Sequence, residues 1–158
     1  MFKRPLSDMF FSAPPTEKAL PHDFRKIPGD GSRTYSPQLI RELRRARDLR
    51  DYAIDLFKDL QEEFPSFKTQ VTLSDNTEQV GETIRKSLHV NLDEQFSWGD
   101  GAPAYRAWRE RISAFGILVF QFESIPETEA LGFSLTERPL PVIGITTKIS
   151  DNGRTFTM

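Results

Sequence analysis

The fold is decided by the stretch GILVFQF at residues 116–122, where the pattern changes from helix to sheet. Gly116 suits the C-terminus of a helix, and the apolar run after it predicts a buried strand. Residues 133–135, Phe-Ser-Leu, alternate as a second strand, and Val142 to Thr146 is predicted as a third. Gly144, inside that third strand, indicates a bulge or the close approach of another chain. Strands this close together predict a small antiparallel or mixed sheet.

A long helix is predicted before this sheet, starting at Ser36-Pro37 and running to about Glu63. Serine can cap the helix, proline is pre-set for its first turn, and Pro65 ends it. Apolar residues recur at three- and four-residue steps, interrupted only at Arg50, which predicts a buried stripe along the helix. The stripe consists of Leu39, Leu43, Ala46, Ala53, Leu56, Leu60 and Phe64. Basic residues precede acidic ones, an order that opposes the helix dipole, so tertiary packing must hold this helix.

Two shorter helices are predicted between the long helix and the sheet. The first runs from about Asp75 to Leu88 and is capped by Ser74. Its predicted buried row is Val80, Ile84 and Leu88. A flexible turn at residues 98–101 separates it from the second helix, Pro103 to Phe115. The inward side chains of that helix are Tyr105, Trp108, Ile112 and Phe115. Aromatic residues at helical spacing are typical of a core rather than of a cofactor site.

The first 35 residues contain enough proline and glycine to exclude a regular helix and to disfavour central strand pairing. Their apolar residues are too many for a free linker, so several are expected to dock on the domain. These are Leu6, Met9, Phe10, Phe11, Leu20 and Phe24. We therefore predict an extended strap over residues 1–35, a helical region over 36–98, and a helix with the small sheet over 99–158. The fold class is α+β, with long helices packed on a three-stranded sheet in one incomplete domain.

The composition fits a soluble globular protein, with 158 residues, 37% hydrophobic residues and 28% charged residues. A formal net charge of -2 gives no general attraction to nucleic acid or to anionic lipid. The lack of cysteine excludes disulfides, thiolate metal sites and a cysteine nucleophile, and it permits a reducing compartment. No apolar run reaches the length of a signal peptide or a membrane span. We predict a cytoplasmic protein without membrane contact.

Arginines cluster in the first half of the long helix, and such a cluster is one footprint of nucleic-acid binding. They are Arg41, Arg44, Arg45, Arg47 and Arg50. Acidic residues are interspersed among them, no aromatic stacking platform accompanies them, and no second helix follows at helix-turn-helix spacing. The pattern therefore favours a solvated or intramolecular role, and direct contact with nucleic acid is not predicted.

Candidate catalytic groups are few. The only histidines are His22 in the strap and His89 at the end of the helix 75–88, and neither has a partner at metal-ligand spacing. The sequence also lacks a Gly-x-Ser-x-Gly elbow, a phosphate-binding loop and a dinucleotide fingerprint. We predict no catalytic residue and no metal ligand in this chain.

A series of motifs runs through the last third of the chain. It consists of WRERI at 108–112, GILVF at 116–120, GFSL at 132–135, LPVI at 140–143 and RTFTM at 154–158. This series resembles the ImmA/IrrE family of zinc metallopeptidases. The resemblance covers most of the chain and is strongest from Trp108 onward. It implies the incomplete scaffold of a zincin-like metallopeptidase.

In that family the Phe-Thr step leads into a His-Glu-x-x-His helix that binds zinc. The resemblance implies that Arg154, Thr155, Phe156 and Thr157 form the first turn of this helix, with the first zinc-binding histidine two positions beyond Met158. We interpret the chain as an N-terminal fragment that is inactive alone, with zinc expected only in a longer form. The resemblance also implies that the strand before the helix borders the cleft and pairs with an extended substrate. Its residues are Val142, Ile143, Gly144 and Ile145.

Members of the family cleave or inactivate helix-turn-helix repressors, and some are toxin–antitoxin components. The resemblance therefore implies a helix-turn-helix repressor as the partner. One alternative is a non-catalytic module that keeps the repressor-docking surface. It is disfavoured because loss of the zinc-binding helix would uncover one face of the sheet, at residues such as Ile117, Val119, Val142 and Ile145. Another alternative is a DNA-binding regulator that uses the arginine-rich helix, which predicts steeply salt-dependent DNA affinity.

Overall fold

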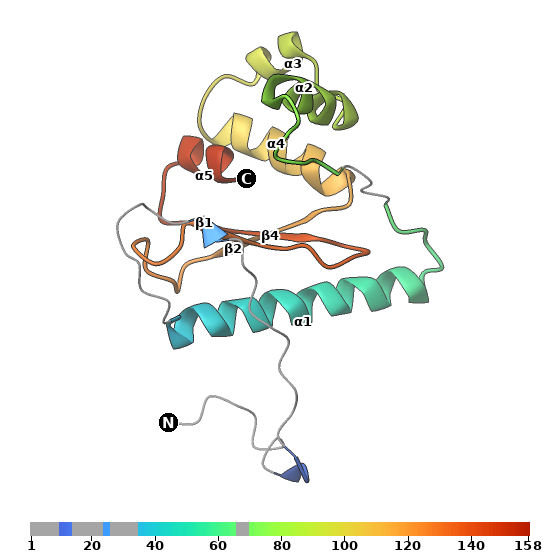
Figure 1. Cartoon of the computed structure of the whole chain (residues 1–158), viewed down its shortest axis with the longest axis vertical. Helices are drawn as coiled ribbons and strands as arrows, with labels where there is room; N and C mark the ends of the chain where they lie inside the picture. Colours follow the sequence, from blue (N-terminus) through green and yellow to red (C-terminus); the bar gives the residue numbers. More distant parts are fainter. Residues whose placement is uncertain (1–9, 14–23, 26–34, 66–69) are drawn as a thin grey trace.

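The computed structural model describes residues 10–13, 24–25, 35–65 and 70–158 (Figure 1). Most of the predicted strap, residues 1–35, therefore lies outside the described residues, as does His22. The sheet forms a middle layer between α1 (Pro37–Asp59) on one face and α4 (Ala102–Ala114) with α5 (Asp151–Thr157) on the other. This mixture of helices and a small sheet confirms the predicted α+β class. None of the helices in the described part combines the length and the apolar character needed to cross a membrane.

The sheet contains the three predicted strands, β2 (Leu118–Phe122), β3 (Gly132–Leu135) and β4 (Val142–Thr146). A two-residue strand, β1 (Phe24–Arg25), is added antiparallel to β3, so the strand order is β1-β3-β4-β2. Because β4 runs parallel to β2 and antiparallel to β3, the sheet is mixed. The last strand in the chain therefore inserts between the two strands that precede it.

The first half of α1 packs on the sheet as its apolar spacing predicts. Ser36 caps the helix, with its side chain accepting a hydrogen bond from the Leu39 amide at 3.1 Å. The core on this face combines α1, the strands and the loop between β2 and β3. Its buried residues are Leu39, Leu43, Ala46, Phe122, Ile125, Ala130, Phe133, Leu135 and Val142. Burial of aliphatic and aromatic side chains is what holds this helix, since its own charge order opposes the helix dipole.

The prediction that the apolar stripe is buried along the second half of α1 is wrong. Leu56 is 57% exposed and Leu60 is 63% exposed, and Ala53 is only half-buried. Figure 1 shows the reason, because the C-terminal end of α1 extends past the sheet. The helix also ends at Asp59, short of the predicted Glu63, and Gln61 then adopts a left-handed φ of 56°.

Arg50 interrupts the predicted stripe in sequence, but the structure places it in the core at 4% exposure. Its Nε donates a hydrogen bond to the carbonyl of Leu140 at 2.8 Å, and a terminal nitrogen donates to the carbonyl of Arg138 at 2.6 Å. Asp51 supplies the neighbouring carboxylate at 3.2 Å. The guanidinium thus anchors the loop before β4 to α1, satisfying main-chain groups that no strand partner reaches.

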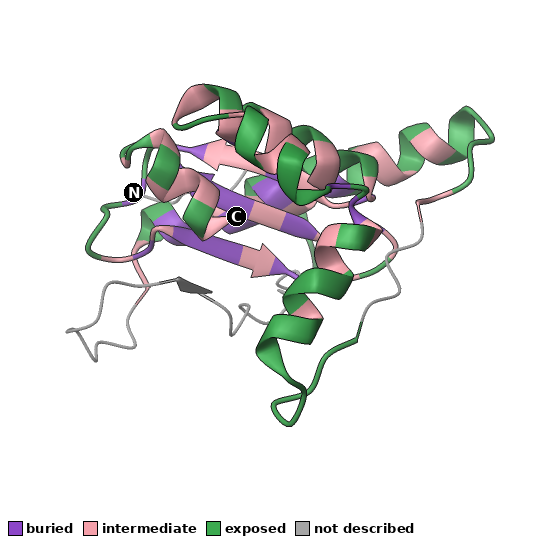
Figure 2. Cartoon of the chain, turned by 90° about the horizontal axis from the view of Figure 1, so that it is seen from above, coloured by how far each residue is buried: buried purple, intermediate pink, exposed green. Residues whose placement is uncertain are grey.

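The opposite face of the sheet is covered by α4 and α5. Tyr105 of α4 packs with Val119 and Ile145 in a second buried cluster, and Met158 packs against its edge. Figure 2 shows that buried residues concentrate in the strands while the outer helix surfaces are exposed. The prediction that this face would be left uncovered is therefore wrong for Val119 and Ile145, which are 5% and 0% exposed. Val142, which was also predicted to be exposed, is 0% exposed and packs on the α1 face.

Two short helices, α2 (Thr77–Ser87) and α3 (Leu92–Ser97), lie beyond α4 (Figure 1). The α2 prediction is confirmed in position, and α3 was missed because six residues are too few to establish a helical period. Trp98 and Trp108 link this region to α4 in an edge-to-face contact with centroids 5.2 Å apart. The predicted helix from Pro103 to Phe115 corresponds to α4. Gly116 follows it with a φ of 91°, as expected for a helix C-terminus.

The predicted cap of α2 at Ser74 is wrong, because Asn76 occupies that position. The Asn76 side chain accepts hydrogen bonds from the amides of Glu78 and Gln79, both at 3.1 Å. We expect Asn76→Ala to lower the free energy of unfolding of this region by about 1 kcal/mol, since two amides lose their acceptor. Hydrogen exchange of the α2 amides measures this loss, and Ser74→Ala is the matched control. Equal effects of the two substitutions would contradict the assignment of Asn76 as the residue that caps α2.

Candidate functional site

The strand predicted to pair with a substrate is central rather than at an edge. Val142, Ile143, Gly144 and Ile145 pair with β2 on one side and with β3 on the other. The prediction of a substrate-edge strand here is therefore wrong. The physical reason is topological: β4 fills the space between two earlier strands, so its main-chain groups already have partners.

Gly144 serves close packing within the sheet. It lies opposite Phe133 in the β3–β4 register, and the Phe133 ring covers it. A Cβ at position 144 would lie 2.3 Å from Cζ of that ring. The ring is itself stacked on Phe122, with centroids 5.5 Å apart. The close approach predicted at this glycine is thus made by a neighbouring aromatic side chain, and the register is continuous without a bulge.

Residues 147–150 connect β4 to α5. Ser150 caps the helix, and its side chain accepts a hydrogen bond from the Gly153 amide at 3.2 Å. Arg154 pairs with Asp151 and lies 4.7 Å from the centroid of the Tyr105 ring. These contacts fix the start of α5 against α4.

The residues predicted to begin the active-site helix are Arg154, Thr155, Phe156 and Thr157, and all four are helical. The hydroxyl groups of Thr155 and Thr157 donate to carbonyls of the preceding turn at 3.0 and 2.8 Å. Phe156 is 77% exposed. The two threonine side chains therefore stabilise the helix, and the Phe156 side chain lies exposed on its surface. The structure assigns no reacting atom to these residues.

No group of three or more histidine, cysteine, aspartate or glutamate side chains could hold a metal ion within the described ranges. His89 is exposed and follows α2 with a φ of 55°. In the part of the chain that the structure describes, the pKa of Glu82 is lowered by a hydrogen bond from Lys86 and by the positive charge of that side chain. This exposed pair spans one turn of α2 and is typical of helix stabilisation rather than of catalysis.

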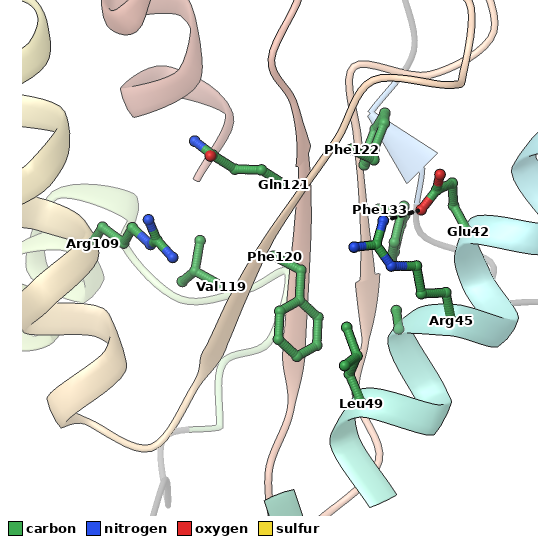
Figure 3. A pocket seen from close by; sticks show the side chains of 10 residues that line it. Glu42, Arg45, Leu49, Arg109, Val119, Phe120, Gln121, Phe122 and Phe133 are labelled. Carbon is green, nitrogen blue, oxygen red and sulfur yellow. Dashed lines mark ion pairs between the residues drawn. The ribbon is translucent and has the colours of Figure 1, made fainter. Parts of the chain in front are cut away.

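A pocket of about 140 Å³ lies along the outer edge of β2 (Figure 3). It is lined by α1, β2, β3 and one residue of α4. The lining residues are Glu42, Arg45, Ala46, Leu49, Arg109, Val119, Phe120, Gln121, Phe122 and Phe133. Figure 3 shows that Arg109 lies on one side of the strand, with Arg45 and Leu49 on the other. The pocket therefore follows the strand edge, and its inner wall includes the core residues Ala46, Phe122 and Phe133.

The hydrogen bonds of β2 show which main-chain groups face this pocket. The Leu118 amide donates to the Pro141 carbonyl at 2.8 Å, and the Phe122 carbonyl accepts from the Thr147 amide at 2.9 Å. Because main-chain groups alternate in direction along a strand of a parallel pair, those of Val119 and Gln121 point outward. Among the described residues no strand pairs with this edge.

The charged side chains that line the pocket differ in their polar contacts. Glu42 lies 3.5 Å from Arg45 and accepts a hydrogen bond from the Ser124 hydroxyl at 2.6 Å. Arg109 is exposed on α4. This site could not be predicted from sequence patterns, because its residues come from distant segments of the chain. The available signals were Arg109, inside the motif WRERI, and Arg45, inside the arginine cluster of the long helix.

A scan against protein-family models found no match, and searches of curated proteins and of solved structures also found none.

Proposed function

We propose that this chain is the scaffold of an ImmA/IrrE-type zinc metallopeptidase and that α5 is the start of its metal-binding helix. The observation that supports this proposal is the passage from β4 through the Ser150 cap into α5. Arg154 to Thr157, which carry the resemblance, lie in the helix that comes after the last strand. A strand that leads into a helix at this point is what the resemblance implies for the approach to the zinc site.

The described residues do not themselves fit a zinc ion, because no suitable cluster of ligands exists among them. We therefore assign no catalytic step to them. Their role in the proposed enzyme is positional. Tyr105 supports Arg154, Asp151 pairs with it, and Met158 packs at the edge of the buried cluster below α5. Together these contacts would orient a continued helix over the sheet.

The proposed substrate is a helix-turn-helix repressor protein in the cytoplasm. The protein, rather than DNA, is proposed as the partner because the arginine cluster of α1 is largely engaged within the chain. Arg50 is buried, Arg47 lies 3.6 Å from Glu137, and Arg45 lies 3.5 Å from Glu42. Steep, salt-dependent DNA affinity of this chain would contradict that part of the proposal.

The test is to read the nucleotide sequence after codon 158 in every frame and to express the chain with the segment found there. If the proposal is right, a His-Glu-x-x-His segment follows within a few codons, and the longer chain binds about one zinc ion. Metal analysis after dialysis measures binding. The 158-residue chain and a variant with the first histidine of the segment replaced by alanine are the controls. Unrelated downstream sequence, or equal zinc content in all three chains, would contradict the proposal.

A non-catalytic protein-binding module is the second candidate function. The observation in its favour is that α4 and α5 cover the sheet face, leaving Val119 and Ile145 only 5% and 0% exposed. A chain with both sheet faces covered has the packing that a stable binding domain needs. This candidate predicts that the 158-residue chain binds a helix-turn-helix repressor without added zinc and without cleaving it.

A further inference from the structure

We propose that the outer edge of β2 binds an extended, acidic peptide segment of a partner protein, which adds to the sheet as a further strand. This inference does not depend on the proposed zinc peptidase function, because it uses a surface formed by α1, β2 and α4. The pocket of about 140 Å³ is well below the roughly 300–1,000 Å³ of sites that enclose a small-molecule ligand. The open edge of β2 can instead bind a single extended peptide strand that lies along it.

The main chain of β2 supplies the affinity for such a segment. The amides and carbonyls of Val119 and Gln121 point away from β4, and no described strand pairs with them. An added peptide strand gains main-chain hydrogen bonds at these groups, as in other proteins that bind peptides by strand addition. Val119 as a residue is 5% exposed and packs with Tyr105, so this part of the edge is held rigidly before binding.

The two sides of the edge select different side chains on the peptide. Toward α1, the partly exposed Leu49 and the half-buried Phe120 offer an apolar surface. Toward α4, Arg109 offers a guanidinium (Figure 3). Successive side chains of a strand point to opposite faces, so the matching segment alternates apolar and acidic residues.

The charges favour an acidic segment over a second copy of this chain. Two arginines and one glutamate line the pocket, and Glu42 already contacts both Arg45 and Ser124. Two copies that paired through β2 would bring their Arg45 and Arg109 side chains toward one another, and like charges across an interface are unfavourable. A carboxylate-bearing peptide instead meets an uncompensated positive charge.

The experiment uses a fluorescent peptide of about seven residues, with blocked ends and alternating valine and glutamate, which is long enough to span β2 at roughly 3.3 Å per residue. Fluorescence anisotropy should show binding to the 158-residue chain. Arg109→Glu should weaken that binding by about tenfold, because it places a like charge against the peptide. Arg106→Glu is the matched control, since Arg106 is exposed on the same helix, does not line the pocket, and changes the net charge equally.

A second readout locates the peptide on the edge. Amide hydrogen exchange at Val119 and Gln121 should be faster than at Leu118 and Phe120 in the free chain, and peptide binding should slow it by about tenfold. A peptide with N-methyl groups on alternate residues should not produce this protection. The proposal is overturned by absence of binding at low salt, by equal losses in the Arg109 and Arg106 variants, or by unchanged exchange at both amides. It is also overturned if these amides are protected by self-association of the free chain.

Discussion

Gly144→Ala is expected to lower the free energy of unfolding by about 2 to 3 kcal/mol, the typical effect of overpacking a rigid core. The added Cβ would lie 2.3 Å from Cζ of Phe133, far inside van der Waals contact. The ring cannot retreat freely, because Phe133 is 5% exposed and stacked on Phe122. Urea denaturation measures the effect as a lower midpoint with an unchanged slope.

Gly81→Ala is the matched control for this substitution. Gly81 lies in α2, and a Cβ there would meet nothing within 4 Å. The substitution of alanine for Gly81 should therefore stabilise the helix by about 0.5 to 1 kcal/mol, because alanine has the better helix propensity. Phe133→Leu shortens the side chain above position 144. Combined with Gly144→Ala, it should show a favourable coupling energy in a double-mutant cycle. Tolerance of Gly144→Ala, or strict additivity with Phe133→Leu, would contradict the clash.

Arg50→Met is expected to lower the free energy of unfolding by about 3 kcal/mol. Methionine keeps much of the apolar stem but removes the donors to the carbonyls of Leu140 and Arg138, at 2.8 and 2.6 Å. Leu140 is 1% exposed, so water does not readily replace the lost hydrogen bond at its carbonyl. Thermal unfolding followed by circular dichroism measures the loss.

Arg41→Met is the matched control, since Arg41 is exposed on the same helix. This control should change the free energy of unfolding by less than about 0.5 kcal/mol, as is usual for surface positions. Arg50→Lys tests geometry, because lysine retains the charge but not the planar fork that reaches two carbonyls. It should fall between the wild type and Arg50→Met. Equal stability of the Arg50→Met and Arg41→Met proteins would show that the buried hydrogen bonds contribute nothing.

Local sequence patterns determined most of the secondary structure. Ser36-Pro37 placed the start of α1, and the β-branched and aromatic runs placed all three longer strands, with β4 predicted at its observed bounds of Val142 to Thr146. These features depend on neighbours within a few residues, such as a capping side chain or the alternation along a strand, so they can be read from the chain. The helical state of Arg154 to Thr157, by contrast, was implied by the family resemblance and not by a local pattern.

The candidate site was less accessible to sequence reasoning. The resemblance implied that Val142–Ile145 pairs with a substrate. The sequence of one strand does not show where that strand lies in the sheet, so its central position could not be predicted. The free edge belongs to β2, and the pocket beside it joins α1 to Arg109 of α4. Residues more than 60 positions apart, such as Arg45 and Arg109, become neighbours of one edge only when the chain folds.

The sequence by itself determined the α+β class, the three longer strands and the start of α1, because hydrophobic period and capping act locally. Only the tertiary structure decided that β4 is central, that Arg50 is buried and that the second half of α1 is exposed. The pattern of α1 is similar along its length, yet Leu43 is 0% exposed and Leu60 is 63% exposed. The difference arises because burial requires a partner surface, and the sheet ends before the helix does (Figure 1).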